Sequence, residues 1–432
     1  MTNTAHSPGP LSHLSVLVSG ASVAGPAVAF WLARHGARVT VVEKAPALRE
    51  GGFAVDFRGR AHHTVLERMG IWDEVSRHQT HMGRQTVVDA DDQEKVDLPA
   101  FMMSGDVEIF RGDLSKIMYE RTKDHVEYVF GDSVAHLRED FDGVDVTFDR
   151  GAPRRFGLVV GADGLHSHTR RLVFGDESRY LRHLGYYAAG FAMPNVLGLH
   201  RSSRICSVPG RMVDISNYDG SPERGGAFLL FRSEQFAYDR DDVAEQKALL
   251  AETFADLPWK HTRHVLDALE DTDELYFDAI AQIHVDRLSQ GRVVLLGDAG
   301  YGATMGGMGT GTALVCAYVL AGELAAARGN HAKAFAAYEA EVRDYTKGCQ
   351  KISGNAGPFL APPTEKKIRS RNRAYRMLSS RFLAGFFKRL TERAANAIEL
   401  KEYPIGMEHP IDKEARGYAG PRPSVASRSR QA

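Results

Sequence analysis

The chain has few cysteines and no long apolar run. Its 432 residues include three cysteines, an odd number without a CxxC pair. This excludes a disulfide framework and a thiolate zinc site and is typical of a reducing compartment. Residues 1–13 are polar and lack the apolar segment of a signal peptide. The most apolar stretch, 312–322, ends at Glu323, short of the roughly 20 residues that cross a bilayer. We expect a soluble, cytoplasmic protein with no membrane span and no metal site.

A charge excess of either sign is also absent. The chain has 54 Lys and Arg residues against 55 Asp and Glu residues, a formal net charge of -1. Binding to a nucleic-acid backbone needs a clear basic excess, so we expect no nucleic-acid partner. Hydrophobic residues make up 43% of the chain and charged residues 25%, which is typical of a globular protein rather than a disordered one.

Glycine is abundant, with 42 residues, and its positions are informative. The first motif lies between an expected strand at 14–19 and an expected helix at 26–35, and consists of Gly20, Ala21, Ser22, Val23, Ala24 and Gly25. Such a turn lets a pyrophosphate approach the backbone and the helix N-terminus, and Ser22, in place of a second glycine, is small enough to permit this. Glu43 lies at the end of the next expected strand and is followed by Lys44. In a dinucleotide-binding unit, a carboxylate at this position accepts hydrogen bonds from both hydroxyls of a ribose. These residues predict a dinucleotide site; the alternative is a turn that only packs a β-α-β unit.

Two further motifs also follow apolar strands. The segment 161–170 contains Asp163, and the segment 297–300 contains Asp298. The second segment runs into a glycine-rich loop and a helix that starts near Gly309 and Thr310. This kind of loop lets backbone amides approach a flat ligand, and the helix dipole stabilises negative charge on it. Either aspartate alone is typical of a turn or a cap, but three motifs at strand ends predict one shared cofactor site.

The order of the expected elements predicts an α/β fold: a doubly wound dinucleotide-binding domain with an inserted antiparallel-sheet domain and a C-terminal helix. The first domain is discontinuous, at 12–77, 108–175 and 291–350, and the insertion takes 78–107 and 176–290. Single elements are expected as strands at 156–160, 184–191, 212–216 and 227–231, one helix in the insertion at 243–254, and a hairpin at 86–98 that turns at Asp91 and Asp92.

The C-terminal part of the sequence is helical. One helix face carries Phe335, Tyr338, Val342 and Tyr345 at spacings of three and four residues. A linker at 354–363 leads to the C-terminal helix, within 364–400, whose apolar face comprises Leu378, Phe382, Phe386 and Leu390. Its opposite face is basic. A basic amphipathic helix can bind a membrane surface, but we favour a helix packed across domains with a solvated cationic face. The tail, 418–432, has the composition of a disordered segment.

Taken together, these motifs resemble the class A FAD-dependent monooxygenases, the para-hydroxybenzoate hydroxylase-like group. Within this group the sequence is most similar to aromatic polyketide hydroxylases and tetracycline-inactivating monooxygenases. The resemblance covers about residues 12–350 and includes Arg111, which opens an Arg-Gly-Asp-Leu segment. It implies that FAD binds as the resident cofactor and NAD(P)H only transiently, and that dioxygen is consumed. It also implies that an aromatic or polyketide-like small molecule is hydroxylated through a flavin hydroperoxide.

The resemblance also implies roles for single residues. Residues 20–25 would hold the FAD pyrophosphate and Glu43 the adenosine ribose, while Arg111 would contact the chain that links them to the flavin. Asp163 would lie near the pyrophosphate and Asp298 at the ribityl chain. The backbone of 306–312 would face the pyrimidine edge of the flavin. Asp56 and Arg58, in the segment 51–58 that flanks the flavin in the family, are further candidates.

Two departures from the family pattern leave alternatives open. Tyr301 stands where the family usually has histidine, and no proline occurs between Asp298 and Pro358. A flavin-binding protein without efficient hydroxylation is therefore one alternative, and a nicotinamide-dependent dehydrogenase is another. No catalytic residue is assigned. A phenol needs a base, but each candidate in the insertion is more typical of a structural or surface residue: His183, Tyr187, Tyr218 and His284. We expect a monomer or a weak homodimer.

Overall fold

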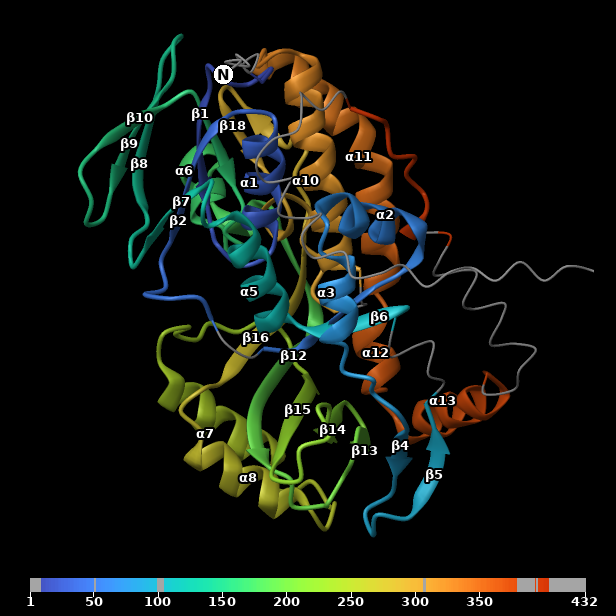
Figure 1. Ribbon diagram of the computed structural model, residues 1–432. Helices are drawn as coiled ribbons and strands as arrows, with labels where there is room; N and C mark the ends of the chain where they lie inside the picture. Colours follow the sequence, from blue (N-terminus) through green and yellow to red (C-terminus); the bar gives the residue numbers. More distant parts are fainter. Residues whose placement is uncertain are drawn as a thin grey trace, which may run out of the picture.

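A computed structural model describes residues 9–49, 52–98, 105–305, 308–378, 393 and 395–403. Two large sheets organise the chain, one in the upper half of Figure 1 and one in the lower half. The first is mainly parallel and lies among helices; the second is mainly antiparallel. The predicted α/β fold, with a dinucleotide-binding part and an antiparallel part, is confirmed.

The parallel sheet has the order β17-β18-β11-β1-β2-β7. Its strands are β1 (Ser15–Ser19), β2 (Arg38–Glu43), β7 (Glu127–Phe130), β11 (Leu158–Gly161), β18 (Val293–Leu295) and the antiparallel edge strand β17 (Ser289–Gln290). Helices of this half are α1 (Ala24–Arg34), α2 (Gly59–Met69), α3 (Trp72–Arg77), α5 (Arg111–Thr122), α6 (His168–Phe174), α9 (Asp298–Tyr301) and α10 (Gly309–Ala326). All three glycine motifs follow strands of this sheet, as predicted.

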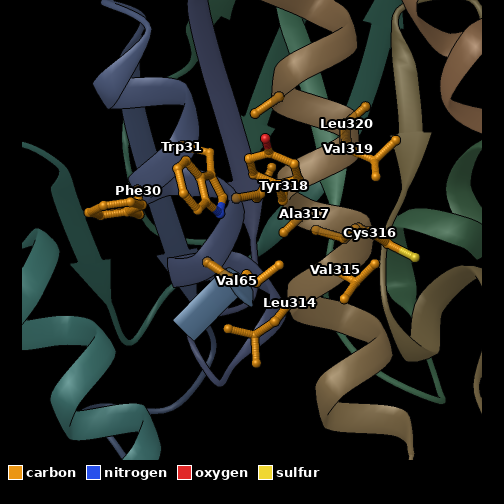
Figure 2. Close-up of a cluster of buried hydrophobic side chains, with 14 of the residues drawn as sticks. Phe30, Trp31, Val65, Leu314, Val315, Cys316, Ala317, Tyr318, Val319 and Leu320 are labelled. Carbon is orange, nitrogen blue, oxygen red and sulfur yellow. The ribbon is translucent and has the colours of Figure 1, made fainter. Parts of the chain in front are cut away.

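The core of this half lies where α1 packs against α10. Trp31 of α1 meets Tyr318 of α10 edge to face, with ring centroids 4.9 Å apart, and Phe30 meets Trp31 in the same way. Figure 2 shows these rings beside Leu314 and Val65. Within the described part of the chain, α10 is the one helix with the length and apolar composition of a membrane span. Of its 18 residues, 83% are buried inside the protein. It is therefore the central core helix of this fold.

The antiparallel sheet has the order β16-β12-β15-β14-β13-β4-β5. Its strands are β4 (Gln85–Val88), β5 (Glu94–Asp97), β12 (Leu181–Pro194), β13 (Ser202–Val208), β14 (Arg211–Asn217), β15 (Arg224–Arg232) and β16 (Tyr276–Ile283). The predicted hairpin joins this sheet through parallel pairing of β4 with β13. One face packs against the helices α7 (Val243–Phe254) and α8 (Thr262–Asp271). We call this the outer face, and the opposite one the inner face.

Three local predictions were wrong. The described part of the insertion contains α8 in addition to the expected helix, because α8 also buries an apolar stripe of Val265, Ala268 and Leu269. The expected strand at 156–160 divides at Gly157. Its first part, β10 (Arg154–Phe156), pairs in a small separate sheet with β9 (Val144–Phe148), which also pairs with β8 (Val134–Glu139). The expected linker contains the short helix α12 (Ala356–Leu360).

The remaining elements connect the two halves. The strands β3 (Ala54–Phe57) and β6 (Val107–Phe110) form a two-stranded sheet, and a short 3-10 helix, η1, spans Glu177–Arg179. The predicted face of α11 (His331–Ser353) is buried at all four positions. The final described helix, α13 (Glu365–Leu378), packs against β5 and β13. Phe382, Phe386, Leu390 and the tail lie outside the described residues.

Candidate functional site

The turn after β1 depends on two glycines. Gly20 has a φ of +105°, and a Cβ there would lie 2.5 Å from the carbonyl oxygen of Ala162. A Cβ on Gly25 would lie 1.8 Å from the carbonyl oxygen of Gly20. Larger residues are therefore sterically excluded at both positions. The turn ends in the first residues of α1, whose free N–H groups and positive dipole end form an anion site.

Glu43 is hydrogen-bonded to this turn. Its Oε2 accepts a hydrogen bond from the backbone N–H of Ala21 at 2.8 Å, and its Oε1 accepts one from Ala45 at 3.0 Å. The side chain remains half-buried at the end of β2, and the neighbouring Lys44 is exposed. Each carboxylate oxygen has a further lone pair for a ligand hydroxyl.

Arg111 brings a positive charge to the turn. It is exposed at the start of α5, and its Nε donates a hydrogen bond to Ser22 Oγ at 3.0 Å. No carboxylate among the described residues forms an ion pair with it. An exposed guanidinium without an acidic partner, next to a helix N-terminus and a glycine turn, suits a phosphate.

Asp163 lies beside the turn, but its carboxylate is already used within the protein. It accepts hydrogen bonds from Ser167, from the Thr169 backbone N–H at 2.8 Å and from Thr169 Oγ1 at 2.8 Å. A Cβ on Gly20 would lie 3.1 Å from the Cα of Asp163, which places the aspartate loop against the turn. Asp163 thus shapes the loop at the start of α6.

Asp298 opens a pocket at the start of α10. Its side chain is exposed there, although the surrounding protein still raises its pKa by desolvation, against the opposing charge of Arg111. Gly309 faces the carboxylate: a Cβ there would lie 3.7 Å from Oδ1. Thr310 is half-buried in the first turn of α10. The described residues that line the pocket are Asp298, Tyr301, Ala303, Met305, Met308, Gly309, Thr312, Thr346, Cys349 and Ser353.

Asp56 and Arg58 differ from the other candidates because both are buried. They form an ion pair, with Arg58 Nε donating to Asp56 Oδ2 at 2.8 Å. The backbone N–H of Arg58 donates to His62 Nδ1 at 3.1 Å, and burial lowers the pKa of His62 to about 3. This pair joins the end of β3 to the start of α2, while Phe53, directly before β3, stays partly exposed.

These groups fit an FAD molecule. The carboxyl ends of β1, β2 and β18 place the glycine turn, Glu43 and Asp298 along one edge of the parallel sheet, with Arg111 between them. Ligands of open α/β sheets bind at this edge. The glycines leave room for phosphates to approach the backbone, Arg111 offers a positive charge to them, and the carboxylates offer acceptors that sugar hydroxyls could use.

The inner face of the antiparallel sheet adjoins this edge. Phe53 contacts Phe228 of β15 and Tyr276 of β16, with ring centroids 5.2 Å and 4.9 Å apart. Tyr276 lies near enough to Arg111 and Asp298 for their charges to act on its phenol, whose pKa burial raises. The cofactor edge and the inner face therefore meet at these rings, which sequence reasoning missed because the contacts join segments more than a hundred residues apart.

A second contact between the halves was also missed. His166, in the loop after Asp163, lies between two carboxylates: Nδ1 is 2.9 Å from Glu177 Oε1, and Nε2 is 3.0 Å from Asp278 Oδ1. Burial disfavours the charged imidazole, but the hydrogen bonds to Asp278 and Glu177 prevail and raise its pKa. Since Asp278 lies on β16, this histidine links the loop that follows Asp163 to the antiparallel sheet.

The four base candidates lie in different surroundings. Tyr187 is on the outer face and donates to the Phe236 carbonyl at 3.3 Å, and the His183 ring is 5.0 Å from it. His284 Nε2 is 3.0 Å from Gln282 Oε1. Tyr218 differs, because its ring is 5.7 Å from Phe110 and its phenol lies near Asp214 and Glu108.

Comparison with known proteins agrees with this geometry. Residues 13–179 match the family model of the FAD binding domain. A flavin-dependent monooxygenase of Legionella longbeachae is 38% identical over 345 residues, 79% of this chain and 88% of its own length. An uncharacterized protein of Mycobacterium tuberculosis is 41% identical over 361 residues, 82% of this chain and 96% of its own. The crystal structure of tetracycline destructase Tet(51) has a TM-score of 0.79 at 32% identity, with 90% of this chain and 100% of that one covered.

The chain belongs to the flavin-dependent monooxygenases. It is accordingly an FAD-binding oxidoreductase of the class that consumes NAD(P)H and dioxygen and hydroxylates aromatic compounds. The predictions of FAD, of a monooxygenase and of the family are confirmed, and membership in this family replaces the dehydrogenase alternative.

Proposed function

We propose that the chain hydroxylates a polycyclic, polyketide-like phenol at the junction of its two sheets. The observation that carries this proposal is the junction itself: Phe53, Phe228 and Tyr276 place aromatic surface beside Asp298 and Arg111. Aromatic side chains with a few polar groups are what a flat, ring-shaped ligand requires. The likeness to a tetracycline destructase supports a substrate of several fused rings.

We propose the following roles for the residues at the cofactor edge. Residues 20–25 and the N-terminus of α1 bind the pyrophosphate, Glu43 and Lys44 lie at the adenosine ribose, and Arg111 neutralises phosphate charge. Asp298 accepts hydrogen bonds from the ribityl chain, and Gly309 and Thr310 present backbone N–H groups to the ring system. Asp163 orders the adjoining loop, and Asp56 and Arg58 hold the segment that begins at Phe53.

When bound, FAD supplies the electron transfer from NAD(P)H and the activation of dioxygen. The protein contributes position, charge and exclusion of water. The dipole of α10 stabilises negative charge near Gly309, and Tyr276 of the inner face lies near Asp298 and helps to shield it from water. Tyr301 contributes no charge, since burial holds its pKa far above the usual range.

The two sheets also support the predicted division into domains. We propose that the FAD-binding domain comprises 12–77, 108–175 and 291–350, and the substrate domain 78–107 and 176–290. We further propose a cytoplasmic protein that is a monomer or a weak homodimer. Light scattering on the purified protein over a range of concentrations tests the last point, and a stable tetramer would contradict it.

Replacement of Asp298 tests the site. Asp298→Ala removes the carboxylate at the start of α10, so the purified variant should contain much less FAD than the parent protein. Asp267→Ala is the matched control, because Asp267 pairs with Arg263 on the surface of α8. The measurement is flavin absorbance per protein. Normal flavin content in Asp298→Ala would overturn the assignment of this residue.

A further inference from the structure

A buried carboxyl oxygen on the inner face has no hydrogen-bond partner among the described residues. It is Oδ1 of Asp214, whose side chain is 6% exposed. The hydroxyl of Ser203 is likewise buried and without a partner, and that side chain is 2% exposed. The Ser203 hydroxyl lies close enough to the Asp214 carboxyl to favour its ionised form, and so opposes the effect of burial on its pKa.

The strand pattern places both groups on the inner face. Val213 and Ile215 of β14 pack in the cluster with α7 and α8, whereas Met212 packs in the opposite cluster. Because side chains alternate along a strand, Asp214 points to the same side as Met212. Ser203 has Ser216 as its strand partner, and Ser216 is two residues from Asp214, so Ser203 shares that side.

The surroundings of Asp214 are aromatic and connect it to the cofactor edge. Its strand partner on β15 is Phe228, whose ring contacts Phe53. On the other side, Tyr218 lies near both Asp214 and Glu108 of β6, and its ring is 5.7 Å from Phe110. Burial raises the pKa of both carboxyls to about 7. Glu108 accepts a hydrogen bond from Thr80, whereas Oδ1 of Asp214 has no donor among the described residues.

A buried carboxyl without any donor is costly, and native proteins rarely leave one unpaired. We propose that the missing donor is the hydroxyl of a phenolic substrate, which Asp214 binds and deprotonates while Ser203 hydrogen-bonds the same oxygen. The phenol O–H bond breaks, its proton passes to Asp214 Oδ1, and the electron pair stays on the phenolate oxygen. Charge is conserved, and the ring becomes electron-rich for hydroxylation. This inference rests on the proposed function and extends it to a named substrate group.

The first experiment needs no variant. The holoenzyme is assayed for NAD(P)H oxidation with 1-naphthol, 1,8-dihydroxyanthraquinone and tetracycline, and with the methyl ethers of the first two. Free phenols should stimulate oxidation, and each methyl ether should stimulate it at least about tenfold less, because it cannot donate to Asp214. Equal stimulation by phenol and ether, or none by any phenol, overturns the proposal. Flavin reduction by NAD(P)H in the same samples reports separately on the monooxygenase assignment.

The second experiment uses variants with the most active phenol of that series. Asp214→Asn keeps the shape but cannot take a proton, so kcat should fall by about 100-fold. FAD content and substrate-free flavin reduction should be unchanged. A fluorinated form of the same phenol, already ionised at the assay pH, should recover most of the loss. Asp267→Asn should behave as the parent enzyme.

Ser203→Ala provides an independent test, because the hydroxyl it removes has no structural partner. It should raise KM several-fold with little change in kcat and no change in thermal stability. If Asp214→Asn lowers kcat equally for the neutral and the ionised phenol, or if Ser203→Ala leaves KM unchanged, the carboxyl has a structural role or binds only water, and the proposal is wrong.

Discussion

Glu43 and Asp163, two carboxylates at the ends of the parallel strands, are held by hydrogen bonds within the protein, whereas Oδ1 of Asp214, on the inner face of the antiparallel sheet, accepts none from the described residues. Glu43 accepts from two backbone N–H groups, and Asp163 accepts from Ser167 and twice from Thr169. Asp214 Oδ1 accepts from no described residue. The cofactor edge is thus pre-organised by its own chain, while the inner face leaves one acceptor for a ligand.

The difference indicates how each half recognises its ligand. A dinucleotide is always the same molecule, so its site is built from rigid backbone and short local contacts. A substrate must be bound and released in each turnover, and its hydrogen bonds are made with the ligand rather than within the protein. If this difference is real, substitutions at the cofactor edge should disturb a rigid site, and substitutions at the junction should disturb contacts that form only with a ligand.

The largest expected effect is at the glycine turn. Gly25→Val places a side chain where even a Cβ would lie 1.8 Å from a carbonyl oxygen, so the purified protein should contain almost no FAD. Gly348→Ala is the control, because a Cβ at that position in α11 meets nothing within 4 Å. It should be neutral or up to about 1 kcal/mol more stable. Flavin content near the parental value in Gly25→Val would show that the turn is not rigid.

A smaller effect is expected from the charge at the turn. Arg111→Met should weaken FAD binding by about tenfold, since a charge-assisted hydrogen bond contributes on the order of 1.5–3 kcal/mol. Titration of apoprotein with FAD measures the dissociation constant. Arg263→Met, which removes an exposed arginine of α8, should leave it unchanged. A dissociation constant within twofold of the parent's for Arg111→Met would contradict the proposed phosphate contact.

The smallest effect concerns the contact between the halves, and it depends on pH. His166 faces Glu177 and Asp278, with Arg170 and Arg240 also bonded to Glu177 and Tyr238 to Asp278. Because the pKa of His166 is raised above 6.5 in the folded state, its stabilisation is complete below pH 6.5. It is lost as the pH rises through the folded-state pKa.

His166→Gln should therefore destabilise the protein on the order of 2 kcal/mol at pH 5.5 and clearly less at pH 8.5. Thermal unfolding of both proteins across this range measures the effect. His78→Gln, which replaces an exposed histidine at the end of α3, is the control. A stability difference that does not change with pH would mean that His166 acts through packing alone.

Much of the cofactor half could be predicted from the sequence because its signals are local. The first strand, the glycine turn, the helix and Glu43 lie within about thirty residues, and each has a steric or electrostatic requirement that only a few residue types meet. The same holds for Asp298 beside the start of α10. Asp163 shows what the sequence cannot decide. Its hydrogen bonds from Thr169 are those of an ordinary capping or turn residue, and the sequence alone does not distinguish this role from cofactor binding.

The inner face could not be predicted in this way. Asp214 is one acidic residue in an alternating strand, and nothing near it in sequence distinguishes it from a solvated side chain. Its burial depends on Tyr218 and on β6, which is distant in sequence. The groups around its carboxyl come from the neighbouring strands β13 and β15. His166 and Phe53 are similar cases, since their partners lie on β16 and β15. Contacts of this kind are visible only in the folded structure.

The most direct test of the central claim uses isotopically labelled dioxygen. The FAD-loaded enzyme is supplied with NAD(P)H, labelled dioxygen and the phenol that best stimulates NAD(P)H oxidation, and the products are analysed by mass spectrometry. We predict a hydroxylated phenol that carries one labelled oxygen atom, with its yield strongly reduced in Asp214→Asn. Reduction of FAD with hydrogen peroxide as the sole oxygen product, across all phenols of the series, would contradict the account.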